Sequence, residues 1–221
     1  MRCSPDAPSN HNNRFIPMTL RLICFIILLS GLTACIPLQP RPDNTRTYAL
    51  GLPDSEQNSA ATSPSKPSVA KSSVAKGYIV RPQFPVYMEG SHLKLISENR
   101  EIVNLPNAHW AEQMEVGVAR AMSVHIETLN GGLKSDFYPW LRAGDAAFTL
   151  QLDFNHLIAT SDGRILIAAN WRYKHGTGET KNGVFADNTI EWLPGDAQSM
   201  VDGINEALKR LAAEIVDSLK K

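Results

Sequence analysis

Residues 148–173, FTLQLDFNHLIATSDGRILIAANWRY, decide the fold. Every second residue is apolar from Phe148 to Phe154, and the same alternation resumes from Ile165 to Tyr173. The triplet Ser161-Asp162-Gly163 between the two arms is typical of a tight turn. Strict alternation on both sides of a turn predicts a long antiparallel hairpin with one buried face.

Two segments with helical periodicity flank this hairpin. The first is expected to run from near Asn107 to the pair Gly131-Gly132, and the second to follow Asp196, whose side chain can cap a helix. Apolar residues recur in steps of four and three in both segments, which predicts one apolar face on each helix. These residues are Trp110, Met114, Val118, Met122, Ile126 and Leu129 in the first, and Met200, Ile204, Leu208, Leu211, Ile215 and Leu219 in the second.

A short strand is expected at 47–50, and further strands at 78–80 and around 184–185. A second hairpin should join 93–96 to 101–103. Residues 53–75 are rich in Ser, Pro, Ala and Lys, which predicts a disordered insertion. The predicted fold class is therefore α+β, a mostly antiparallel sheet with two main amphipathic helices packed on one face, within a single domain over residues 46–221.

The N-terminal region has the order of a secretion signal. Arg14 and Arg21 precede a short apolar run at 22–29, and the run Leu32-Thr33-Ala34-Cys35 follows it. The apolar run is too short to span a membrane and suits a signal sequence. It resembles a bacterial lipoprotein signal, so residues 1–34 are expected to be removed and Cys35 to be lipidated. A true start at Met18, or an uncleaved anchor, is left open.

Lipidation of Cys35 would rule out internal disulfides and would place the protein at a membrane. All three cysteines lie at or before this position, so residues 35–221 cannot form an internal disulfide. Two or more acyl chains, palmitate among them, anchor a protein stably, and residues 35–45 would form a proline-rich tether. By resemblance to other lipoproteins, Ile36 rather than Asp at the next position favours the outer membrane over the inner membrane, on the periplasmic face.

Charge and motifs exclude several functions. Three of the 22 basic and one of the 22 acidic side chains precede residue 35, which leaves 19 and 21, a net charge of −2. That balance gives no reason to expect nucleic acid as a partner. No nucleophile elbow, phosphate-binding glycine loop or His-Glu-x-x-His motif occurs, so neither an enzyme nor a metal site nor a cofactor beyond the lipid is expected.

Six residues stand out as structural or interface candidates. The apolar position of Trp110 in its stripe favours the core, although a binding role stays open. The others stand in motifs whose order along the chain is more specific than any one alone. These motifs are Thr47-Tyr48-Ala49-Leu50, residues 85–88 and 93–96, Trp110-Ala111-Glu112, Tyr138-Pro139-Trp140 and Ala169-Asn170-Trp171. The candidates are Pro85, Tyr87, Trp110, Glu112, Trp140 and Trp171.

In this order the motifs resemble the ABC-type transport auxiliary lipoproteins, the PqiC (YmbA) family. The chain departs from that pattern at Gln113 and Met114, where Pro-Leu is usual, and at Ser97, where a basic residue is common. The resemblance implies a non-catalytic accessory or adaptor of a system in which MCE-domain proteins and inner-membrane components carry lipids between two membranes. A structural or assembly lipoprotein and a lipoprotein hydrolase are the alternatives, and homo-oligomerisation is left open.

Overall fold

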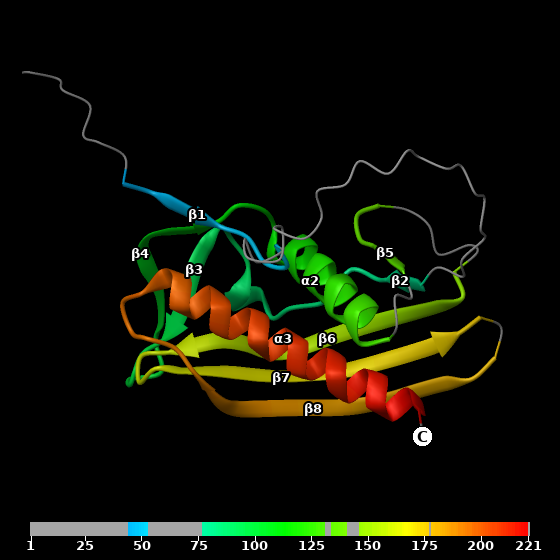
Figure 1. The fold of residues 1–221 in the computed structure, drawn as a ribbon. Helices are drawn as coiled ribbons and strands as arrows, with labels where there is room; N and C mark the ends of the chain where they lie inside the picture. The colour runs from blue at the N-terminus through cyan, green and yellow to red at the C-terminus, as the bar shows by residue number, and fades with distance from the viewer. Residues whose placement is uncertain (1–43, 53–76, 131–133, 141–145, 177, 221) are drawn as a thin grey trace, which may run out of the picture. The chain divides into compact units, whose positions relative to one another are not determined.

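The long hairpin forms the centre of the sheet. The structure, a computed structural model, describes residues 44–52, 77–130, 134–140, 146–176 and 178–220. Strands β6 (Phe148–Thr160) and β7 (Arg164–His175) pair antiparallel from Phe148 opposite His175 to Ala159 opposite Ile165 (Figure 1). Gly163 takes a positive φ of 88° in the turn, a conformation that favours glycine. The predicted hairpin is confirmed.

Two further antiparallel pairings extend this centre. Strand β8 (Thr180–Glu191) pairs with β7, and β3 (His92–Ile96) forms a hairpin with β4 (Ile102–Trp110).

Asp196 caps the last helix as predicted, because its carboxylate accepts a hydrogen bond from the backbone N–H of Gln198 at 2.9 Å.

Short parallel pairings complete the eight-stranded sheet that the described strands form. Strands β2 (Gly77–Ile79) and β3 both pair with the same edge of β6, at its two ends. Strand β5 (Ser135–Phe137) adds to β2, and β1 (Arg46–Tyr48) adds to β4. The path from one margin to the other is β1-β4-β3-β6, then β7 and β8.

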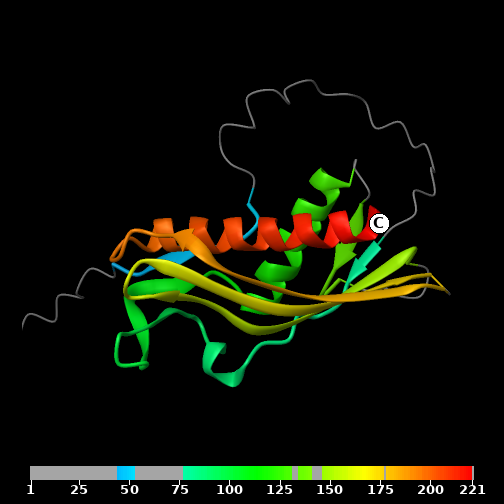
Figure 2. The same ribbon diagram turned by 90° about the horizontal axis from the view of Figure 1, so that it is seen from below.

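Both long helices lie on one face of this sheet, α2 (Met114–Leu129) and α3 (Ala197–Lys220) (Figure 2). They pack against each other as well as against the strands. Helix α2 also buries small residues such as Gly117 and Ala121 beside its larger apolar ones, and these two lie against Leu50 and Gly51. The α+β class, with a mostly antiparallel sheet and two helices, is confirmed.

One predicted boundary is wrong. The first long helix begins at Met114, not near Asn107, and residues 107–110 belong to β4. Asn107 has a positive φ of 54°, which a right-handed helix excludes. Ala108 and Trp110 pair with Arg46 and Tyr48 of β1, a contact between distant parts of the chain that local periodicity does not encode.

Several predictions concern residues outside the described ranges. They are the signal at 1–34 with Leu32, Thr33 and Ala34, the lipidated Cys35, most of the tether, and the insertion at 53–75. Within the described ranges, neither helix has the combination of length and apolar character needed to cross a bilayer.

Candidate functional site

A hollow of about 560 Å³ lies where the segment 81–91 faces the turn between β4 and α2. We call it the cleft. Apolar and charged side chains share its lining, which suits recognition of an amphipathic surface better than of a purely apolar ligand. Its lining residues are Arg81, Phe84, Met88, Glu89, Gly90, Ser91, Trp110, Ala111, Glu112, Gln113, Met114 and Glu115.

Segment 81–91 follows the edge of β6 between β2 and β3 without forming a full strand. Pro82 lacks a backbone N–H and so cannot donate to a ladder. Gln83 still bridges to β6, since its N–H donates to the Leu152 carbonyl and its carbonyl accepts from the Phe154 N–H, each at 2.9 Å. Beyond this bridge the chain leaves β6 and makes the single 3-10 turn η3 (Val86–Met88).

Tyr87 ties this turn to a bulge in β6. The register of β6 against β7 shifts between Phe154 and His156, and a bulge leaves one residue outside the ladder. The Tyr87 hydroxyl donates to the Asn155 carbonyl at 3.1 Å and lies 2.9 Å from His156 Nδ1. Burial raises the pKa of the Tyr87 phenol, so this donor keeps its proton at neutral pH. Tyr87 positions the wall of the cleft.

Pro85 and Lys94 stabilise the same turn. The Pro85 carbonyl accepts from the Met88 N–H at 2.9 Å. Lys94 Nζ donates to the Tyr87 carbonyl at 3.0 Å and also to the Glu89 carbonyl. Met88 is buried below the turn. One wall of the cleft is therefore fixed at both ends by hydrogen bonds to β3 and β6.

Trp110 forms the opposite side at the end of β4. Its side chain is 8% exposed and belongs to the main apolar core, while part of it reaches the cleft. Its backbone N–H donates to the Ser91 carbonyl at 2.6 Å, and the next N–H, of Ala111, donates to Tyr48 of β1 at 2.8 Å. The backbone that carries the ring is thus held by Ser91 on one side and by β1 on the other, and the ring contributes to both core and cleft.

Glu112 holds the turn into α2 through Arg120. Arg120 Nη1 donates to one Glu112 oxygen at 2.9 Å, and its Nη2 pairs with the other. The same guanidinium donates to the Leu50 carbonyl at 3.1 and 2.7 Å. Both side chains are about one quarter exposed. A bidentate pair of this kind fixes geometry as well as contributing energy, so Glu112 orders the floor of the cleft.

Arg81 and Glu115 join the two walls. Arg81 Nη2 donates to Glu115 Oε1 at 3.0 Å, from the end of β2 to the first turn of α2. The guanidinium also lies 5.5 Å from the centre of the Tyr138 ring. The hydrogen bond to Glu115 raises the pKa of Arg81. Sequence reasoning missed this pair, although an arginine directly before Pro82, at the end of a strand, was an available signal.

The remaining candidates lie elsewhere. Trp140 is 68% exposed after β5, and Trp171 is buried on β7 under the edge of β8. Of the six candidates, Trp110 and Glu112 line the cleft, while Pro85 and Tyr87 stabilise the turn next to it.

No three His, Cys, Asp or Glu side chains of the described ranges are arranged to hold a metal ion. His92 and His109, opposite each other on β3 and β4, have ring centres 4.2 Å apart. Ser91 Oγ lies 3.4 Å from His109 Nδ1. His109 therefore lies in a strand beside another histidine and not at a helix start.

Comparison with known proteins gives a family and a fold. The family model for the ABC-type transport auxiliary lipoprotein component matches residues 49–216, while no curated protein matches the chain. A crystal structure of an uncharacterized protein is 15% identical and has a TM-score of 0.56. The match covers 66% of this chain and 93% of that one, and it supports the fold alone.

Two other solved structures are similar at lower scores. A DUF330-family protein from Xanthomonas campestris is 13% identical, over 64% of this chain and 81% of its own, with a TM-score of 0.45. A PelC dodecamer from Paraburkholderia phytofirmans is 12% identical, over 61% of this chain and 86% of its own, with a TM-score of 0.31.

Proposed function

We propose, from the premise that this chain belongs to the family of ABC-type transport auxiliary lipoprotein components, that the protein is a non-catalytic adaptor that holds a partner protein at a membrane. We further propose that this partner is an MCE-domain protein of an intermembrane lipid transport system. Lipid on Cys35 would anchor the protein to the outer membrane, facing the periplasm.

The convergence of two motifs on one cleft is the observation that carries this proposal. Residues 85–88 and 110–112 both supported the family resemblance. Met88 of the first segment lines the same hollow as Trp110, Ala111 and Glu112 of the second. Pro85 and Tyr87 position one wall, and Trp110 and Glu112 lie in the other. We propose that the cleft receives a segment of the partner, because a preformed and ordered surface lowers the entropy lost on binding.

Charge pairing within the cleft suits recognition better than catalysis. Arg81 is paired with Glu115, and Glu112 with Arg120. Each of these four side chains is held in place by its ion-pair partner, and an ordered surface of this kind suits the binding of a partner. This arrangement supports an adaptor over the alternative of a hydrolase.

The test of this proposal blocks the cleft with a bulky side chain at a position that does not contribute to the fold. Gln113 is exposed, lines the cleft and makes no side-chain capping bond to α2. Gln113→Trp should leave the melting temperature unchanged and reduce co-purification of an MCE-domain protein at least tenfold, because the indole fills the hollow. The lipidated full chain would be isolated in mild detergent and its partners quantified by mass spectrometry.

Gln198→Trp is the matched control, since Gln198 is also exposed near a helix start but lies on α3 outside the cleft. It should bind as the native chain does. Partners from secretion or cell-wall machinery in place of an MCE-domain protein would instead support a structural or assembly lipoprotein.

A further inference from the structure

Strand β8 presents a second surface, separate from the cleft by the width of β6 and β7. It is the outermost strand at the lower margin of Figure 1, and β7 is its only strand partner among the described residues. Its register against β7 is unbroken from Thr180 to Asp187. Along such a strand the outward backbone N–H and C=O groups are available to pair with another extended chain.

The other end of β8 is closed by side chains. Asp187 accepts hydrogen bonds from the backbone and hydroxyl of Thr189, each at 2.8 Å. Arg210 of α3 reaches over to Asp187 at 2.8 Å and to Thr189 at 2.9 Å. The register is also irregular between Ile165 and Ile167 of β7. The open part of the edge is therefore residues 180–186.

A buried donor without a partner lies directly beside this open part. The Trp171 side chain is 4% exposed, and its Nε1–H has no hydrogen-bond partner among the described residues. Leaving such a donor unpaired costs free energy. Gly183 of β8 lies against the indole so closely that a Cβ there would be 2.9 Å from Nε1. The unpaired Nε1–H of Trp171 therefore faces β8 at Gly183, the one glycine of residues 180–186.

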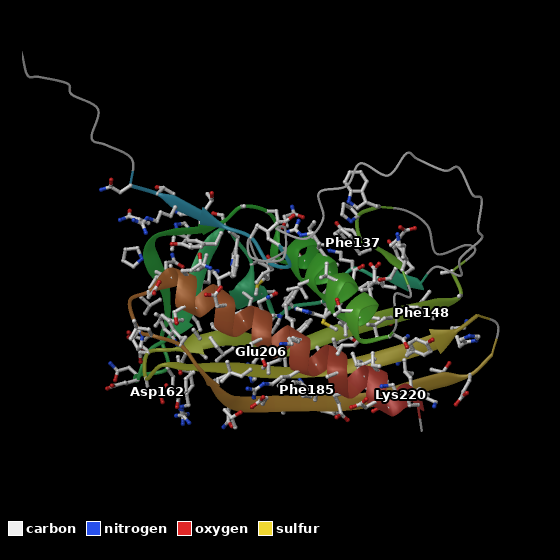
Figure 3. All side chains as sticks on the ribbon, in the orientation of Figure 1. Phe137, Phe148, Asp162, Phe185, Glu206 and Lys220 are labelled. Carbon is white, nitrogen blue, oxygen red and sulfur yellow. The ribbon has the colours of Figure 1, made fainter. Side chains whose placement is uncertain are left out.

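A hollow of about 470 Å³ opens between this strand and the end of α3. Trp171 lies at its base, and the rim is formed by residues 180–184 with Glu214 and Ser218 of α3. Phe185 and Lys220, labelled in Figure 3, mark the strand and the helix end that flank it. On the other face of the strand Val184 is 73% exposed. An added strand would place side chains on both faces.

We propose that residues 180–186 of β8 accept an extended segment of a partner protein as an added strand, with a side-chain oxygen opposite Gly183 that accepts from Trp171 Nε1–H. Alternation then predicts an apolar partner residue opposite Val184. The recognised segment is a strand with a Ser, Thr, Asn or Gln beside an apolar residue. This surface does not depend on the cleft or on the partner being an MCE-domain protein.

A second copy of this chain does not fit the same requirement. In a two-fold antiparallel pairing of β8 with β8, the residue opposite Gly183 comes from the helix-facing set Lys181, Gly183, Phe185 and Asp187. The first three side chains carry no acceptor, and the Asp187 carboxylate already accepts from Thr189 and Arg210. The unpaired Trp171 donor therefore points to a partner of different sequence.

Site-specific photo-crosslinking in the native membrane tests this proposal with the full chain. A benzophenone amino acid would replace Thr180, Asn182, Val184 or Ala186, one at a time, with Val103 on β4 as an exposed strand control. Strand addition predicts crosslinks to one partner segment, with the partner residue number changing in step with the position on β8. Trp171→Phe should lower the yield about fivefold, the value of one hydrogen bond.

Four outcomes would overturn the proposal. They are no yield above the Val103 control, crosslinks to scattered partner residues, crosslinks to a second copy, and an unchanged yield in a folded Trp171→Phe variant. Gln113→Trp, which tests the cleft, should leave the β8 crosslinks unchanged. The two proposals can therefore fail separately.

Discussion

Replacing Trp110 with alanine should destabilise the protein strongly even though the ring touches the cleft. The side chain is 8% exposed and packs in the main core. Truncating a buried Trp typically costs about 3–5 kcal/mol, because burial is lost and a cavity remains. Since part of the ring faces the cleft, water can enter there and relieve the cavity, so we expect the lower end of that range, about 3 kcal/mol.

Urea unfolding followed by circular dichroism measures this loss. A change of about 3 kcal/mol in a domain of this size corresponds to roughly 6–12 °C in melting temperature. The midpoint should fall while the slope stays constant, which identifies a change in stability. Trp140→Ala is the matched control, since that ring is 68% exposed. It should change stability by less than about 0.5 kcal/mol.

An unchanged midpoint in Trp110→Ala would refute the assignment of Trp110 to the core. If partner binding were lost at the same time, Trp110 would be an interface residue, and the burial of its ring would contribute little to the free energy of unfolding. A large loss of stability in Trp140→Ala would refute the use of exposure to rank these rings.

Three further predictions concern other parts of the molecule. Burial and a neighbouring Lys209 lower the pKa of His125 below its ordinary value of 6.5. As the pH drops below 6.5 the unfolded chain binds the proton first, so the free energy of unfolding should fall, and His125→Gln should flatten that part of a stability–pH curve. Gly183→Ala places a Cβ 2.6 Å from Trp171 Cζ2, so it should lower the unfolding free energy by about 1–3 kcal/mol, as a urea titration would show. Cys35→Ser should move the protein from the membrane fraction to the soluble fraction with an unchanged melting temperature, and a variant that stays in the membrane would contradict lipid anchoring.

Elements built from neighbouring residues could be predicted from the sequence. The β6–β7 hairpin is one, because both strands show the alternation and Gly163 supplies the turn. Helix α3 is another, since its apolar stripe and the cap at Asp196 are both local. In the hairpin the second strand begins a few residues after the first one ends, and in α3 the cap directly precedes the helix.

Pairings between distant segments could not be predicted in the same way. The parallel contact of β1 with β4 places Trp110 in a strand, although its spacing from Met114 and Val118 equally fits a helix. Periodicity reports which face is buried, but it does not report which distant strand will cover a backbone edge. The start of α2 was misplaced for that reason.

The cleft itself was not predicted from the sequence. Trp110 and Glu112 stood out as residue types in a motif, and they do line it. The sequence did not reveal that Glu112 would be held by Arg120, or that Arg81 would reach Glu115 across the two walls. The first pair depends on the turn into α2, and the second on how the segment after β2 lies against α2; only the fold determines both.

Both proposed surfaces depend on the central strand β6, through its two different edges. On one edge Pro82 and Pro85 interrupt the ladder between β2 and β3, so the chain turns away and forms a wall of the cleft. On the other edge β7 and β8 continue the ladder outward until it ends at an open strand. A partner in the cleft and a strand added to β8 would therefore lie beyond opposite edges of β6 and would not compete. One rigid domain could then hold two segments at once, which raises the effective concentration of the second after the first has bound.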